Sequence, residues 1–366
     1  MSDFFGNKDY NEYFEKLNNR VNSQIEKSAE KKQSKKKGYY KVVRLRRRAL
    51  AIALVLVLLL VIIFSVKGCK KDSSSEKPNL ITESKPTENK NDTVPKKVTF
   101  KALGGETQAI PEANDAKTAI VLRISDKAII AERGRNERIF PASTLKIMTL
   151  LTAVEHIKDL DETFTMTYEI TDPLYLADAS VAGFLNGEEV KMRDLLYGMI
   201  LPSGADSAMA LAVKIAGSEE AFVKLMNERV KKMGLKDTHF TNVSGLHNEN
   251  NYSTAYDMAV ITYHAMQNEL CRKVLSTYQY TTEKTPQHTE GILLSSTLFS
   301  YLYGDEPETA EILGGKTGFV NESGYCIATF GKSTETDEEY IVVTMGNSSK
   351  WPAFYGQIDL YKQFAK

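Results

Sequence analysis

The longest apolar run in the chain extends from Ala49 to Val66 and contains neither a charged residue nor a proline. A helix needs roughly 20 apolar residues to cross a bilayer, so this run predicts a single transmembrane helix over 49–66. A cleavable signal peptide is not favoured, because a long polar segment precedes the run and no small-residue cleavage pattern follows it.

Hydrophobic positions are scarce between residues 67 and 110. This segment is rich in Ser, Lys, Glu, Asn and Pro and poor in aromatic residues, so it cannot bury enough surface to fold. We predict a disordered linker over 67–110. From residue 111 to residue 366 the composition is that of a packed domain, long enough for one substantial core.

Within 111–366, strand patterns occupy both ends and helical patterns occupy the middle. Two β-rich runs around Ser125-Asp126 predict a hairpin, and the runs GYCIATFGK and EYIVVTMGN predict a second one, preceded by a strand around 313–318. This order predicts an α+β domain, with a sheet assembled from both ends and packed against a helical body. Helical periodicity covers 143–157, 192–200, 204–216, 219–233, 254–267 and 351–365.

The charges of the chain cancel in total but are unevenly placed. The 366 residues include 47 Lys and Arg and 47 Asp and Glu, yet residues 1–48 hold 14 basic and 6 acidic side chains, a net charge of +8, which leaves −8 for the rest. Because basic flanks stay on the cytoplasmic side, we predict a basic cytoplasmic tail over 1–48, with the linker and the domain extracellular. The predicted location is the cell membrane, and no nucleic acid is expected as a partner.

The three cysteines are Cys69, Cys271 and Cys326, and no C-x-x-C pair occurs among them. Neither a disulfide framework nor a zinc ribbon is indicated, and the histidines show no H-E-x-x-H pattern, so we expect no metal and no cofactor. Two alternatives stay open: a lipid on Cys69, which follows the apolar run, and a disulfide between Cys271 and Cys326 in place of two buried thiols.

Ser143 and Lys146 stand three residues apart at the start of a predicted buried helix, which brings the hydroxyl and the amine to one face. A serine hydroxyl is a weak nucleophile and needs a base within hydrogen-bond reach. A lysine in a partly desolvated cleft is neutral often enough to serve. By itself, however, S-x-x-K also describes a helix-capping serine followed by an exposed lysine.

Two later segments change that balance. Ser203 lies in a predicted loop between two helices, where a hydroxyl can be held towards a cleft. Lys316-Thr317-Gly318 lies in or beside a predicted strand, and its glycine allows close approach to the backbone. The ordered set of S-x-x-K, Ser-Gly and K-T-G is a specific catalytic signature.

Residues 111–366 resemble the serine penicillin-recognising enzymes, and most closely the low-molecular-mass penicillin-binding proteins that act as D-alanyl-D-alanine carboxypeptidases. The segment F-P-A-S-T-L-K around Ser143 and the segment from Ser253 to Ala259 look like further blocks of that family. The resemblance implies a β-lactamase/transpeptidase-like fold with an antiparallel sheet. It also implies release of the terminal D-alanine from peptidoglycan stem peptides, with β-lactams as covalent inhibitors.

The resemblance also implies a role for each catalytic residue. Ser143 would form the acyl-enzyme, Lys146 would remove its proton, and Ser203 would relay a proton to the leaving amine. Backbone N–H groups of Ser143 and Phe319 would form the oxyanion hole, where donors act on charge that develops only in the transition state.

The substrate's terminal carboxylate would bind Lys316 and Thr317, with Gly318 and Phe319 completing the substrate-binding segment. One position departs from the family pattern. The second motif is usually Ser-x-Asn, but its third position here is Ala205. The amide that would contact the substrate and steady the lysine is therefore missing, which predicts lower catalytic efficiency.

Several other functions share parts of this pattern. A peptidoglycan DD-endopeptidase has the same motifs and stays an alternative, and so does a low-activity sensor of muropeptides or β-lactams, because of Ala205. A class A β-lactamase would add an E-x-x-L-N segment, which the sequence lacks, so slow deacylation is expected. The segment AEILGGKT imitates a phosphate-binding loop, but it lacks the first glycine and no helix follows it.

Overall fold

The computed structural model describes residues 97–302 and 307–366. The predicted cytoplasmic tail, the predicted transmembrane helix and the linker up to residue 96 lie outside these residues. Within 97–302 and 307–366, no helix combines the length and the apolar character that crossing a bilayer requires.

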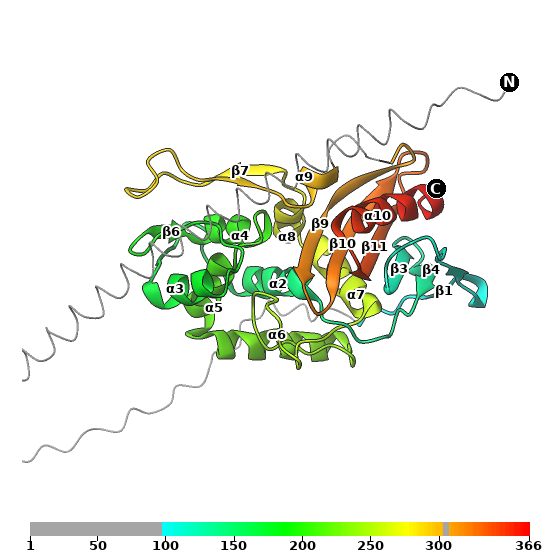
Figure 1. Ribbon diagram of the computed structural model, residues 1–366, viewed down its shortest axis with the longest axis horizontal. Coiled ribbons are helices and arrows are strands. Elements are labelled where there is room, and N and C mark those ends of the chain that lie inside the picture. The colour runs from blue at the N-terminus through cyan, green and yellow to red at the C-terminus, as the bar shows by residue number, and fades with distance from the viewer. Residues whose placement is uncertain (1–96, 303–306) are drawn as a thin grey trace, which may run out of the picture. The chain divides into compact units, whose positions relative to one another are not determined.

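A seven-stranded sheet runs through the described domain (Figure 1). Its strands lie in the order β1-β4-β3-β11-β10-β9, and β2 also pairs with β4. The pairings from β4 through to β9 are antiparallel, whereas β1 and β2 run parallel to β4. The strands are Lys101–Ala102 (β1), Gln108–Ala109 (β2), Thr118–Arg123 (β3), Ala128–Arg133 (β4), Ala310–Val320 (β9), Gly324–Ser333 (β10) and Glu339–Asn347 (β11).

Both predicted hairpins are confirmed, as β3–β4 and β10–β11. The two ends of the domain meet where β3 pairs with β11, for example at Val121 opposite Val342. The sheet is therefore assembled from both ends of the domain, as the strand and helix patterns predict. β9 is the last strand in the order, so one of its edges pairs with no other strand among the described residues.

The domain begins earlier than the predicted boundary at residue 111. Phe100 is only 3% exposed, and its ring meets Tyr263 edge-on at 5.5 Å. β1 and β2 also pair with β4, so residues 97–110 belong to the fold and not to a linker. The amino-acid composition of 67–110 does not reveal this segment. It is held in place by one buried apolar side chain, Phe100, and by backbone pairing with β4, neither of which changes the average composition.

Most of the helices pack against one face of the sheet, while residues 298–302 and the last helix cover the other face. The predicted helices from 192 to 267 are confirmed within a residue of their ends, whereas the helices Tyr168–Leu176, Glu269–Leu275 and Phe299–Leu302 are not among the predicted ones. The helices are Lys146–His156 (α2), Tyr168–Leu176 (α3), Met192–Ile200 (α4), Ala205–Ala216 (α5), Glu219–Met233 (α6), Ala255–Gln267 (α7), Glu269–Leu275 (α8), Phe299–Leu302 (α9) and Lys350–Phe364 (α10). Two small antiparallel two-stranded sheets accompany the helices: Thr163–Thr165 (β5) with Glu189–Lys191 (β6), and Gln279–Thr281 (β7) with Leu293–Ser295 (β8).

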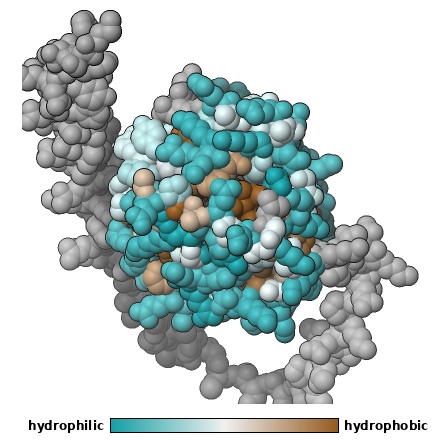
Figure 2. Space-filling model, turned by 90° about the vertical axis from the view of Figure 1, so that its right-hand side faces the viewer, coloured by the Kyte–Doolittle hydropathy of each residue, from teal (hydrophilic) through white to brown (hydrophobic). Residues whose placement is uncertain are grey.

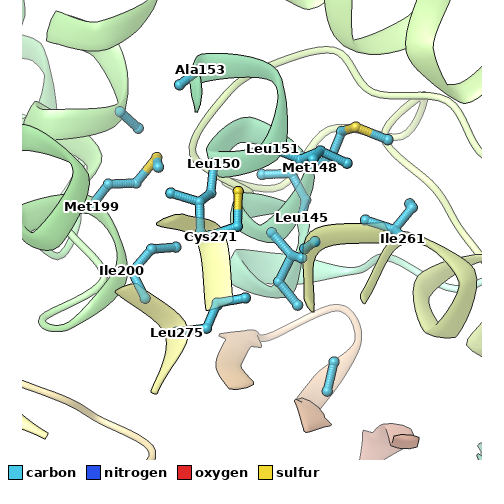
Figure 3. Packing of buried hydrophobic residues seen from close by; sticks show 14 of the residues in the cluster. Leu145, Met148, Leu150, Leu151, Ala153, Met199, Ile200, Ile261, Cys271 and Leu275 are labelled. Atoms are coloured by element: carbon cyan, nitrogen blue, oxygen red, sulfur yellow. The ribbon is translucent and has the colours of Figure 1, made fainter. Parts of the chain in front are cut away.

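Helix α2 lies at the centre of the larger core. Figure 3 shows its side chains Met148 and Leu151 among those of α4, α7 and α8, including Ile200 and Ile261. Cys271 of α8 packs there as a buried free thiol, and Cys326 is likewise free and buried, so the two do not pair. A helix enclosed in this way holds its first turn in a fixed position.

The two faces of the sheet belong to separate cores. Ile120, Ile341 and Val343 face the helical body, while their neighbours Val121 and Val342 face α10, as the alternation along a strand requires. Figure 1 shows α10 lying across β10 and β11 on that second face. The outer surface in Figure 2 is mainly hydrophilic, with an apolar area near the centre of the view.

Candidate active site

The first turn of α2 holds the predicted nucleophile and base. A short 3₁₀ turn, Ala142–Leu145, leads into the helix, and Lys146 is its first residue. Lys146 Nζ lies 2.9 Å from Ser143 Oγ. The three-residue spacing thus puts the two groups in direct hydrogen-bond contact, as predicted.

Two further groups contact the lysine. Ser203 Oγ lies 3.5 Å from Lys146 Nζ, and the carbonyl oxygen of Ser244 accepts a hydrogen bond from the same nitrogen. A neutral amine has two N–H donors and one lone pair. When Lys146 is protonated, Nζ donates to Ser143 as well as to Ser203 and Ser244, and the Ser143 hydroxyl donates to the Ser244 carbonyl oxygen at 3.3 Å. When Lys146 is neutral, it can donate to Ser203 and Ser244 and accept the proton of Ser143 on its lone pair, as a general base must.

Burial tunes the lysine for this role. Lys146 is 1% exposed, and desolvation lowers its pKa to about 7, against the opposing effect of the Asp206 carboxylate. Backbone N–H groups of Ala182 and Gly183 hold that carboxylate at 2.8 and 3.0 Å. A pKa near 7 means that about half of the Lys146 side chains are neutral at neutral pH.

The K-T-G segment lies on β9, opposite the nucleophile. Lys316 is also 1% exposed, and its Nζ donates to the Thr317 carbonyl at 2.7 Å. Burial and the nearby Lys146 hold the pKa of Lys316 well below its ordinary value. The hydroxyl of Thr317 faces the cleft and lies 2.8 Å from that of Thr297.

Two glycines allow the chain to close around the nucleophile. A Cβ on Gly318 would lie 2.7 Å from the backbone nitrogen of Ser143, and a Cβ on Gly245 would lie 2.2 Å from the carbonyl oxygen of Ala142. Gly245 also has a φ of +81°, which disfavours other residues. Gly318 is therefore needed so that the turn containing Ser143 can pack closely against β9, and not only to allow the approach of a ligand.

Strained backbone gathers at this cleft. Ala142, Asp178 and Ser203 have φ values of 49°, 54° and 66°, in the left-handed region that residues other than glycine rarely adopt. Such conformations persist where the surrounding structure imposes them, and they cluster at functional sites. Ala142 belongs to the turn that positions Ser143, and Ser203 is itself one of the residues predicted to be catalytic.

A cavity of about 350 Å³ joins these groups. Among the sequence-predicted site residues, Lys316 is enclosed behind the cavity wall, while the other six line it. Its lining falls into three parts: the nucleophile side (Ser143, Lys146, Ser203, Ala205, Ser244, Gly245, Leu246), the loop after α3 (Asp178, Ala179, Ser180), and the β9, α9 and α10 side (Thr297, Tyr301, Thr317, Gly318, Phe319, Val320, Tyr325, Lys350, Phe354).

Motif analysis missed groups that the fold adds to the site. The Ser244 carbonyl contacts the lysine as a backbone atom, so no residue type marks it. The neighbouring Ser-Gly-Leu block, in which Gly245 must approach Ala142, was the signal that could have found it. Asp206 and Lys350 carry no motif of their own and reach the site through tertiary packing.

Comparison with known proteins agrees with this geometry. The profile of the D-alanyl-D-alanine carboxypeptidase family matches residues 105–349. The chain is 33% identical over 229 residues to D-alanyl-D-alanine carboxypeptidase DacF of Bacillus subtilis. This match covers 60% of the chain and 55% of DacF, so the chain spans about half the length of that relative.

Solved structures show the same fold. The crystal structure of the Streptomyces K15 DD-transpeptidase superposes with a TM-score of 0.60 at 28% identity, over 68% of this chain and 97% of that one. Penicillin-binding protein 5 from Haemophilus influenzae gives a TM-score of 0.60 at 27% identity, over 69% of this chain and 70% of that one. The expected α+β, transpeptidase-like fold is therefore confirmed for the described domain.

Proposed function

The chain belongs to the D-alanyl-D-alanine carboxypeptidase family, and from that premise we propose that it is a serine carboxypeptidase acting on peptidoglycan stem peptides. The observation that carries the proposal is the contact of 2.9 Å between a buried Lys146 amine and the Ser143 hydroxyl, at the wall of an open cavity. A base of pKa about 7 beside a hydroxyl nucleophile is suited to acyl transfer at neutral pH.

Acylation begins at the carbonyl carbon of the penultimate D-alanine. Ser143 Oγ attacks this carbon while Lys146 Nζ takes the hydroxyl proton. The backbone N–H groups of Ser143 and Phe319 stabilise the oxyanion. The peptide C–N bond then breaks, and Ser203, which lies 3.5 Å from the protonated Lys146, passes a proton to the departing D-alanine amine.

The terminal carboxylate of the substrate binds on the β9 side. Thr317 lines the cavity, and its hydroxyl lies 2.8 Å from that of Thr297. This hydroxyl donates a hydrogen bond to the substrate's carboxylate. Lys316 contributes its charge from behind the wall. Lys350 adds a cation that lines the cavity itself, with its Nζ 3.0 Å from the Tyr301 hydroxyl.

Water completes the cycle by hydrolysing the Ser143 ester. The sequence lacks the E-x-x-L-N segment with which class A β-lactamases activate that water. A β-lactam therefore acylates Ser143 and stays attached, which makes β-lactams inhibitors of the enzyme and not substrates that it turns over rapidly.

The test is to incubate the full chain, kept in detergent, with labelled penicillin and to map the adduct by mass spectrometry. We expect a stable adduct on Ser143 and release of D-alanine from a stem pentapeptide. Both are lost by about 10³-fold or more in Ser143→Ala, as for other nucleophile deletions. Ser125→Ala, in the β3–β4 turn, is the matched control. A full-length protein that forms no adduct and releases no D-alanine would refute the proposal.

The hydrophobic and charge patterns of the sequence support a location in the cell membrane. The apolar run 49–66 anchors the enzyme in the cell membrane, with 1–48 in the cytoplasm and the catalytic domain outside. Protease added to intact spheroplasts should then release the catalytic domain. Complete protection of that domain would contradict this orientation.

A further inference from the structure

The position that departs from the family pattern is hydrogen-bonded to a second segment of the cavity lining. Ala205 begins α5, and its backbone N–H donates to the carbonyl oxygen of Ser180 at 2.8 Å. Ser180 belongs to the loop after α3, and both residues line the cavity. The residue that lacks an amide is therefore joined directly to a residue that carries a hydroxyl.

The loop that contains Ser180 is fixed to the start of α5 by further contacts. The carboxylate of Asp206, which is 1% exposed, accepts hydrogen bonds from the backbone N–H groups of Ala182 at 2.8 Å and Gly183 at 3.0 Å. A Cβ on Gly204 would lie 2.8 Å from the Ala182 nitrogen, so this glycine permits the close packing. These contacts give Ser180 a defined position beside the second motif.

The hydroxyl of Ser180 is available to a ligand. Six serine and threonine residues line the cavity: Ser143, Ser180, Ser203, Ser244, Thr297 and Thr317. Five of their hydroxyls have a hydrogen-bond partner within the protein. The hydroxyl of Ser180 has none in the part of the chain that the structure describes, and the residue is exposed at the cavity. Because a hydroxyl both donates and accepts, it can bind a peptide group.

A donor is needed at this place if the proposed function holds. In the family pattern, the asparagine that Ala205 replaces contacts a peptide bond of the substrate. The methyl group of Ala205 forms no hydrogen bond. Asp178 lines the cavity in the same loop, but an ionised carboxylate only accepts hydrogen bonds and so does not bind a carbonyl oxygen. Ser180 is the neighbour of Ala205 that has a hydroxyl donor to offer.

We propose that Ser180 is a substrate-binding residue whose hydroxyl donates to the carbonyl oxygen of the peptide bond preceding the penultimate D-alanine. It replaces the substrate contact of the missing amide and leaves Lys146 to its contact with the Ser244 carbonyl. Ser180 thus selects the acyl part of the substrate and moves no proton. One neutral hydrogen bond of this kind changes a rate by about fivefold.

The experiment compares two β-lactams on the full chain in detergent. Benzylpenicillin carries an amide carbonyl on its side chain, whereas 6-aminopenicillanic acid has the same bicyclic core with an amine in place of the amide. Ser180→Ala should slow acylation of Ser143 by benzylpenicillin about fivefold and leave that by 6-aminopenicillanic acid within about twofold. A displaced nucleophile or a misfolded site would slow both. An equal change for the two compounds, or no change for either, would overturn the proposal.

Two further variants and a control sharpen the assignment. Ser180→Thr keeps the hydroxyl and should retain the ratio of the two rates. Ser276→Ala also alters an exposed serine, at the end of α8 and away from the cavity, and should leave the ratio unchanged. In the Ala205→Asn background the amide is restored, so Ser180→Ala should cost less than about twofold. A full fivefold loss in that background would show that Ser180 does not replace the amide.

Failure of this proposal is distinguishable from failure of the proposed function. If the unaltered chain releases no D-alanine and forms no adduct on Ser143, the proposed function has failed and the role of Ser180 with it. If the unaltered chain forms the adduct but Ser180→Ala keeps the ratio of the two rates, only the role of Ser180 has failed.

Discussion

The two faces of the sheet bring different kinds of side chain to one cleft. From the α2 face come Lys146 and Lys316, both 1% exposed, with Ser143 fixed by tight backbone contacts. From the α10 face come Tyr301, Lys350 and other side chains that line an open cavity. The two lysines have lowered pKa values because burial removes water from them. The side chains from the α10 face instead form part of the cavity wall that a ligand would contact.

This difference separates chemistry from selectivity. A base must be desolvated and rigid, so the α2 face tolerates little change. Side chains of α9 and α10 that only line the cavity can vary without changing the position of Ser143. Changes on the α2 face should therefore alter the rates for all substrates alike, and changes on the α10 face should alter the ratio between substrates.

After the loss of Ser143 itself, the largest effect on the α2 face is expected from Gly245→Ala. The new Cβ would lie 2.2 Å from the Ala142 carbonyl oxygen and displace the nucleophile's turn. Such a displacement should slow acylation of Ser143 by penicillin about a hundredfold, and it should slow D-alanine release to a similar extent.

Gly217→Ala is the control for Gly245→Ala. Its φ of +82° matches the +81° of Gly245, but no atom lies within 4 Å of the new Cβ. Both variants carry the same backbone strain, but only Gly245→Ala adds a clash with the Ala142 backbone, so thermal unfolding should show the larger loss of stability in Gly245→Ala. Equal acylation rates in the two variants would mean that contact with Ala142 is not needed.

The next effect is the pH dependence of acylation. Lys146 acts as a base only when it is neutral, and its pKa is about 7. Protonation increases as the pH falls, so the acylation rate should drop below pH 7 and be about tenfold lower at pH 6 than on the alkaline plateau. Stopped-flow acylation between pH 5 and pH 9 measures this profile. A rate independent of pH across this interval would exclude Lys146 as the titrating base.

The smallest effect concerns Ala205, which lines the cavity where the family pattern has an asparagine. Ala205→Asn supplies an amide at the start of α5 and should raise D-alanine release by about fivefold, the effect of one added hydrogen bond. Ala216→Asn, at the other end of the same helix, is the control. If Ala205→Asn leaves the rate of D-alanine release unchanged, another group already makes the contacts with substrate and lysine that the asparagine amide would make.

Much of the fold was predictable because its signals are local. Helix periodicity around Met148 and Leu151, the left-handed cap at Gly234 and the two hairpins each depend on residues close together in the chain. The start of the domain was not predictable, because Phe100 is buried by Tyr263, which lies far away in the sequence.

The candidate site divides in the same way. The sequence alone determined the pairing of Ser143 with Lys146, because one helical turn spans the distance, and it marked Ser203 and the K-T-G segment by their order. Only the tertiary structure decided that Ser203 and Ser244, 57 and 98 residues from Lys146, meet the same amine. It also decided the pKa of that amine and which side chains of α9 and α10 line the cavity, because burial and contacts between distant elements exist only in the folded chain.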